Sequence, residues 1–302
     1  MKYKFVAMGE CMVEMAPTAD GTYVMGFAGD TLNTAWYARK LFPESWTVSY
    51  LTTVGTDGVS NSMVQFIEAA GLDTGIIGRR DDKTVGLYVI QLSNGERSFA
   101  YWRSDSAAKT LASDADDFQA KLDGAKVVYF SGITLAILAE PDRVTFLEGI
   151  AKARAAGSTI VLDPNLRLRL WSNVDEMREV ITKASQHSDI ILPSYEDEVT
   201  FFNDGSQEET ARRYGGAGAG LVVVKNGPGD VVCLRDGVLS SYSSIPVENV
   251  LDTTAAGDSF NAGFLAAYLD DGDLKKAVDA GNRLACRVIG QRGALVDVLE
   301  PA

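Results

Sequence analysis

The segment DTTAAGDSFNAGFLAAYL, residues 252–269, joins a loop of small residues to an apolar helix and organises the rest of the chain. Phe260, Phe264 and Tyr268 recur every four residues, which predicts one apolar face of an α-helix. Asp258 stands at the start of that helix, where several backbone N–H groups lack intrahelical partners and favour an anion such as phosphate. Two interpretations stay open, because Asp258 is either a proton acceptor beside a phosphate site or an ordinary acidic N-cap residue.

The small residues before Asp258 would let a bulky anion approach the backbone. The loop resembles the C-terminal signature of the ribokinase (PfkB-type) sugar kinase family, which usually reads DTTGAGD and is followed by a helix. This chain has Ala255 where that family commonly has Gly, and the difference removes some backbone freedom. The resemblance implies that Asp258 is the catalytic base and that the N–H groups of Ala255, Ala256, Gly257 and Asp258 form its anion hole.

Composition restricts the class of protein. The 302 residues, 46% of them hydrophobic, suffice for one large α/β domain with or without a small accessory part. A net charge of -13 disfavours a broad basic face for nucleic acid, so any Arg or Lys that serves an anionic substrate must act locally. The three cysteines fit neither a disulfide framework nor a zinc site, and a reducing cytoplasm is expected. No segment approaches the ~20 apolar residues of a membrane span.

Strands and helices alternate along most of the chain. Strands separated by helices of 10–15 residues predict a mostly parallel sheet with helices on both faces, within a single α/β domain that spans residues 1–302. Ligands of such sheets bind at the carboxyl ends of the strands. Polar clusters follow the predicted strands at 163–167, Ser194 and 225–230, which predicts that the ligands bind there.

A small β-sheet lid is predicted from residues 12–28 and 82–103. The second part contains two apolar strands joined through Asn-Gly, a strong hairpin signal. Side-chain alternation places Tyr101 and Arg103 on one face of the second strand, and Tyr88 lies on the first strand. An arginine beside a tyrosine suits an anionic sugar. The alternatives are a solvent-facing Arg103 and simple cross-strand packing of Tyr88 with Tyr101.

Two further stretches resemble the same family. AGDTLNTA, residues 28–35, resembles its N-terminal signature, which implies that Gly29, Asp30 and Asn33 hold sugar hydroxyls; helix capping by the polar residues is the alternative. The turn 225–230 resembles the family's nucleotide loop. The nucleotide contacts implied in this way are Arg167, Ser194, Lys225, Gly227, Gly229 and Asp230.

The segment Ser194–Asp197 stands where the family has its Mg²⁺-associated NxxE motif. It departs from that motif, with Ser for Asn and Asp for Glu, so Asp197 becomes the candidate metal-associated carboxylate. The alternative is acidic charge at a helix start, which stabilises a helix by ~0.3–1 kcal/mol. ATP and Mg²⁺ are the expected cofactors, and no GxxxxGK[ST] P-loop is present in the sequence.

Two arginines direct the expectation about the substrate. Tyr101-x-Arg103 and the DPNxR stretch that ends at Arg167 resemble those of 2-keto-3-deoxygluconate kinases, where such groups contact the substrate carboxylate or phosphate. A structural or ATP-phosphate role of Arg167 is the alternative. The resemblance implies a kinase that phosphorylates 2-keto-3-deoxy-D-gluconate at its terminal (C6) hydroxyl and forms homo-oligomers through the lid. A fructokinase or ribokinase, and a sugar-binding regulator without turnover, stay open.

Overall fold

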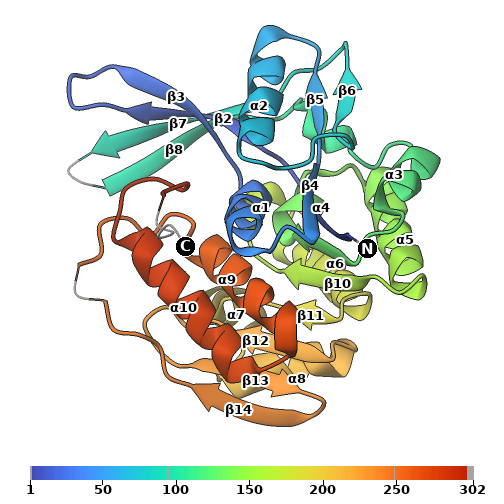
Figure 1. The fold of residues 1–302 in the computed structure, drawn as a ribbon, viewed down its shortest axis with the longest axis vertical. Coiled ribbons are helices and arrows are strands. Elements are labelled where there is room, and N and C mark those ends of the chain that lie inside the picture. The colour runs from blue at the N-terminus through green and yellow to red at the C-terminus, as the bar shows by residue number, and fades with distance from the viewer. Residues whose placement is uncertain (1, 94–95, 248, 298–302) are drawn as a thin grey trace.

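The computed structural model describes residues 2–93, 96–247 and 249–297, and an eight-stranded sheet forms its centre (Figure 1). The strand order is β14-β13-β12-β11-β10-β9-β1-β4. The strands from β12 to β4 pair in parallel, whereas β13 pairs antiparallel with both β12 and β14. The strands are β1 (Tyr3–Met8), β4 (Trp46–Leu51), β9 (Val127–Ser131), β10 (Thr159–Asp163), β11 (Ile190–Ile191), β12 (Leu221–Val224), β13 (Val231–Arg235) and β14 (Val238–Tyr242).

Helices cover both faces of this sheet, and each face has its own apolar core. Along β1 the side chains alternate, so that Phe5 and Ala7 enter one core while Val6 and Met8 enter the other. The first core is closed by α1 (Asp30–Leu41), α2 (Gly58–Ala69), α9 (Ala256–Asp271) and α10 (Leu274–Ile289). The second is closed by α3 (Ala115–Leu122), α4 (Gly132–Ile137), α5 (Glu140–Ala155), α6 (Val174–Gln186), α7 (Tyr195–Phe202) and α8 (Gln207–Ala217).

Helix α9 packs closely against α10. A methyl group on Gly263 would lie only 2.8 Å from the backbone oxygen of Ala280, so the helices can approach this far only because that position is glycine. Phe260 and Phe264 are buried on the same helix and stack with their ring centroids 6.1 Å apart. This packing fixes the first turn of α9, which carries Asp258, against the sheet.

A separate four-stranded sheet extends from the edge of the main body (Figure 1). Its order is β3-β2-β7-β8, formed by β3 (Tyr23–Ala28), β2 (Met12–Pro17), β7 (Gly86–Ser93) and β8 (Glu96–Trp102). The predicted fold class, a mostly parallel sheet with helices on both faces and a small additional sheet, is thereby confirmed. The predicted Asn-Gly turn at 94–95 lies outside the described residues. That this small sheet moves as a lid stays a prediction.

Four shorter elements lie outside the two larger sheets and their helices. A two-stranded parallel sheet is formed by β5 (Thr53–Gly55) and β6 (Gly78–Arg80), and single 3-10 turns lie at Ala107–Thr110 (η1) and Leu168–Leu170 (η2). Among the described residues, no helix has the length and apolar character needed to cross a membrane.

Candidate active site

The loop before α9 is held in one conformation by its own first residue. The carboxylate of Asp252 accepts hydrogen bonds from the backbone and hydroxyl of Thr254 at 3.1 and 2.7 Å, and from the amide of Gly293 at 2.8 Å. Ala255 adopts a left-handed conformation with φ 60° and ψ 16°, which ordinarily favours glycine. The geometry therefore explains why a Gly suits this loop position, and shows that this chain tolerates the strain of an Ala there.

The predicted anion hole has fewer available backbone N–H donors than the sequence suggested. The amide of Ala256 donates to the backbone oxygen of Thr253 at 3.2 Å, so that donor is already used in a turn. The amides of Gly257 and Asp258 open the first turn of α9, where backbone N–H groups lack intrahelical partners. These two are the donors best placed to meet an anion.

The half-buried carboxylate of Asp258 lies against the start of α1. Its Oδ2 accepts a hydrogen bond from the side-chain amide of Asn33 at 2.8 Å, and its backbone oxygen accepts one from the Thr34 hydroxyl at 3.2 Å. Burial, followed by the nearby charge of Asp30, raises the pKa of Asp258 to about 8, although the Asn33 hydrogen bond lowers it. A carboxylate whose pKa lies near neutral pH is suited to accept a proton from an alcohol.

The polar residues at the start of α1 contact both this site and the first turn of their own helix. The N-cap residue of α1 is Gly29, which has no side chain to accept a capping hydrogen bond. A methyl group there would lie 2.2 Å from the backbone oxygen of Glu10, so only glycine fits. Asp30 accepts a hydrogen bond from the side-chain amide of Asn165 at 2.7 Å, and burial raises its pKa. Asn33 also accepts a hydrogen bond from the backbone amide of Gly29 at 3.4 Å, so this residue supports the start of its own helix and contacts Asp258 at the same time. That these polar residues hold sugar hydroxyls stays a prediction.

A lysine stands beside the anion loop. A methyl group on Gly257 would lie 3.6 Å from Lys225 Nζ, so this ammonium group faces the start of α9. Lys225 Nζ also contacts Asp163 Oδ2 at 3.3 Å and Asn261 Oδ1 at 3.0 Å. The side-chain amide of Asn261 completes the network by donating to Asp163 at 2.7 Å and to the Tyr129 hydroxyl at 3.0 Å. The network holds a positive charge where a phosphoryl group would meet the helix.

Asn261 was missed in the sequence, although one signal could have found it. It follows Asp258 by three residues, which places both on the same side of α9. It is fully buried among apolar neighbours of the helix, and a buried amide requires partners. Asp163, named only as part of a polar cluster at a strand end, turns out to be the carboxylate that Asn261 and Lys225 share.

The residues predicted to contact the nucleotide lie at the ends of β11 and β12. Ser194 and Lys225 form an isolated parallel bridge, and the amide of Tyr195 donates to the backbone oxygen of Lys225 at 2.8 Å. The turn that follows contains Gly227 with φ 51° and Gly229, whose amide donates to the backbone of Asn226 at 2.7 Å. The last predicted member, Asp230, is exposed at the end of this turn.

Asp197 and Arg167 occupy the same side and face each other. Arg167 Nη1 lies 3.2 Å from Asp197 Oδ2, and burial raises the pKa of that carboxyl despite the guanidinium beside it. Among the described residues no cluster of three or more His, Cys, Asp or Glu side chains could hold a metal ion. A single carboxylate fits Mg²⁺ that is carried mainly by phosphate oxygens and water.

The predicted lid residues lie on one face of the small sheet. Tyr88 is paired directly across from Tyr101, with ring centroids 5.8 Å apart, and the Tyr88 hydroxyl donates to Glu14. Arg103 does not point to solvent: its guanidinium forms an ion pair with Glu10, and both side chains are almost fully buried. The solvent-facing alternative for Arg103 is therefore wrong, while its contact with a substrate stays a prediction.

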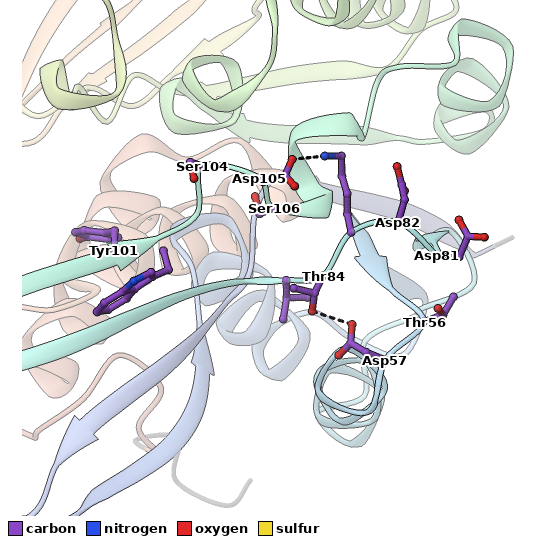
Figure 2. A pocket seen from close by; sticks show the side chains of 12 residues that line it. Thr56, Asp57, Asp81, Asp82, Thr84, Tyr101, Ser104, Asp105 and Ser106 are labelled. Atoms are coloured by element: carbon purple, nitrogen blue, oxygen red, sulfur yellow. Dashed lines mark hydrogen bonds and ion pairs between the residues drawn. The ribbon is translucent and has the colours of Figure 1, made fainter.

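A hollow of about 580 Å³ lies at the base of the small sheet (Figure 2). Its wall contains Asp57, which accepts a hydrogen bond from the Thr84 hydroxyl at 2.8 Å, and Lys83, which pairs with Asp105. Asp57 and Lys83 thus each have a partner within the wall. The lining includes Tyr101 but no residue of the 225–230 turn or of the start of α9. We therefore place the candidate active site at Asp258 and Lys225, and not in this hollow.

Comparison with known proteins agrees with this geometry. The profile described as pfkB family carbohydrate kinase matches residues 2–300. The chain belongs to the pfkB family of carbohydrate kinases. The predicted resemblance to the ribokinase (PfkB-type) family is confirmed, while the role of Asp258 as catalytic base stays a prediction.

The chain is similar over its whole length to proteins of this family. It is 38% identical to the 2-dehydro-3-deoxygluconokinase of Dickeya dadantii, covering 96% of this chain and 95% of that protein. It is 36% identical to the 2-dehydro-3-deoxygluconokinase of Haemophilus influenzae, covering 97% and 96%. An uncharacterized sugar kinase of Pyrococcus horikoshii, solved in complex with ATP, superposes with a TM-score of 0.81 at 26% identity, covering 96% and 93%.

Proposed function

We propose that this family member is an ATP-dependent kinase that phosphorylates 2-keto-3-deoxy-D-gluconate, also called 2-dehydro-3-deoxygluconate, at its terminal C6 hydroxyl. The observation that carries the proposal is that Asp258, a carboxylate with a raised pKa, and the ammonium group of Lys225 both lie at the start of α9. The names of the two similar proteins from Dickeya dadantii and Haemophilus influenzae support the choice of substrate.

In the proposed reaction Asp258 takes the proton of the C6 hydroxyl. The freed oxygen forms a bond to the γ-phosphorus of ATP as the bond from that phosphorus to the β,γ-bridging oxygen breaks, and ADP leaves. Phosphoryl transfer depends mostly on positioning and on stabilisation of charge. The amides of Gly257 and Asp258 and the ammonium of Lys225 supply that stabilisation, and Asn33 orients the Asp258 carboxylate.

The nucleotide is proposed to lie along the turn after β12. Ser194, Lys225, Gly227, Gly229 and Asp230 line this side, and the similar Pyrococcus horikoshii protein was solved with ATP. Mg²⁺ supplies further neutralisation of phosphate charge when it is bound. Asp197 would hold it, with Arg167 released from that carboxylate to meet phosphate or substrate.

The sugar acid is proposed to lie between the start of α1 and the small sheet. Asp30 and Asn33 offer hydrogen bonds to its hydroxyls, while Tyr88 and Tyr101 cover it from the sheet. Arg103 stays a candidate for the carboxylate. It can act only by exchanging Glu10 for the substrate, because the two side chains are paired in this structure.

The opposite face of the small sheet is proposed to bind a second copy of the chain. Strand pairing places Tyr23, Met25 and Trp102 on the face away from Tyr88 and Tyr101, and these three are 45%, 48% and 61% exposed. Clustered exposed apolar side chains mark interaction sites on soluble proteins. Trp102→Lys should shift the sedimentation coefficient toward the monomer, and an oligomer unaffected by this change would contradict the assignment.

The function is tested by coupling ADP formation to a spectrophotometric readout across a panel of sugars. We expect 2-keto-3-deoxy-D-gluconate to give a far higher kcat/KM than fructose or ribose. A preference for a neutral sugar would show a kinase of different specificity. Binding of the sugar acid with no ADP formed would favour the regulator without turnover.

A further inference from the structure

A second arginine of the loop after β10 contacts the small sheet directly. Arg169, in η2, donates from Nη2 to the Tyr101 hydroxyl at 2.6 Å. Its guanidinium carbon also lies 4.3 Å from the centre of the Tyr101 ring. Arg169 thus connects the main domain to the sheet face that carries the predicted substrate tyrosines.

The loop that carries Arg169 passes around the whole candidate site. Asp163 belongs to the Lys225 network, Asn165 donates to Asp30, and Arg167 faces Asp197. Arg169 then reaches Tyr101. Four successive contacts therefore run from the phosphoryl side of the site to the small sheet, and Arg169 stands at the sugar end of this path.

The three arginines around the site differ in whether their charge is already neutralised. Arg103 is paired with Glu10, and Arg167 is paired with Asp197. Arg169 is exposed and forms no ion pair with a carboxylate of the described chain, because its contact is a neutral phenol. It can meet an anion without giving up an existing ion pair.

We propose that Arg169 is a specificity-determining residue that binds the carboxylate of the sugar acid while it holds Tyr101. This rests on the proposed function. A guanidinium has five N–H donors in a planar fork, and only one is used on Tyr101. The remaining donors suit the two parallel hydrogen bonds of an arginine–carboxylate pair. The chain as a whole carries a charge of -13, so a local positive group is needed to attract an anionic sugar.

The test compares two substrates that differ only at C1. The first is 2-keto-3-deoxy-D-gluconate, and the second is 3-deoxy-D-fructose, in which a hydroxymethyl group replaces the carboxylate. For Arg169→Gln we expect the ratio of kcat/KM for the acid to kcat/KM for the neutral sugar to fall about 10- to 100-fold, the range of a lost charge-assisted hydrogen bond. The KM for ATP should not change.

Two further variants separate charge from structure. Arg169→Lys keeps the charge without the planar fork, so it should recover part of the lost ratio. Arg212→Gln, on the exposed surface of α8, removes an arginine far along the chain and should leave the ratio unchanged.

The outcomes are distinguishable. If Arg169→Gln lowers activity on both substrates equally, Arg169 only supports the small sheet and the inference is overturned, while the proposed function stands. An unchanged ratio overturns it as well. If the wild-type protein itself prefers 3-deoxy-D-fructose, the proposed function fails together with the inference.

Discussion

Replacing Asp258 by Asn should lower activity and raise stability in the same protein. The amide has nearly the same shape, and its oxygen can still accept the hydrogen bond that Asn33 donates at 2.8 Å. It cannot take a proton from the substrate hydroxyl. Because general base catalysis contributes about 10²- to 10⁴-fold, kcat should fall by that factor while the affinity for ATP is kept.

The size of the stability gain follows from the pKa of Asp258. Folding raises this pKa from an ordinary 3.8 to about 8, so between these values the folded protein holds a proton that the unfolded chain releases. The free energy of unfolding therefore falls as pH rises through this window. Each pKa unit corresponds to about 1.4 kcal/mol, and about four units set a ceiling near 6 kcal/mol. Because the ionisation of Asp258 is coupled to that of the nearby Asp30, the gain should be smaller than this ceiling. We expect Asp258→Asn to raise the free energy of unfolding by about 2–3 kcal/mol.

The gain should depend on pH in one direction. Urea unfolding at pH 9 should show Asp258→Asn more stable than the wild type, whereas at pH 4 the two should agree. Wild-type kcat/KM should rise with pH toward an apparent pKa near 8, and the variant should lose this dependence. Asp270→Asn, at an exposed position of the same helix, is the matched control. A near-normal kcat, or a stability difference equal at both pH values, would refute the reasoning.

Three further predictions concern the supports of the site. Arg103→Ala leaves the buried Glu10 without its ion-pair partner and should reduce the free energy of unfolding by about 3–5 kcal/mol. The control Arg212→Ala should change it little. A loss below about 1 kcal/mol for Arg103→Ala would show that the ion pair does not stabilise the fold. Ala255→Gly relieves a left-handed backbone and should stabilise by up to about 1 kcal/mol, and a lower urea midpoint would contradict the strain. Hydrogen exchange in 96–103 should slow when the sugar acid binds, and unchanged exchange at saturation would argue against a closing lid.

Local patterns were sufficient for most of the fold. The four-residue spacing of Phe260 and Phe264 predicted α9, and two apolar strands joined through Asn-Gly predicted the paired strands that carry Tyr88 and Tyr101. These features depend on a few neighbouring residues, so the sequence contains them directly. The short strand β6 escaped notice, because it has only three residues and no resolvable period.

Long-range pairing accounts for what the sequence could not provide. Glu10 is the buried ion-pair partner of Arg103, which follows it by 93 residues, and no local pattern marks this contact. The amide of Asn261 joins Asp163 to Lys225 across the sheet. Such partners are brought together only by the topology, and a single sequence carries no record of which side chains meet.

The most direct test of the central claim is to identify where the phosphate goes. The protein would be incubated with ATP and 2-keto-3-deoxy-D-gluconate, and the product examined by ³¹P–¹H correlation NMR, with Asp258→Asn alongside. Activation of the terminal hydroxyl by Asp258 predicts one phosphomonoester coupled to the two C6 protons, formed by the wild type and at most slowly by the variant. A phosphate on another hydroxyl, or ADP released with only inorganic phosphate, would contradict the account.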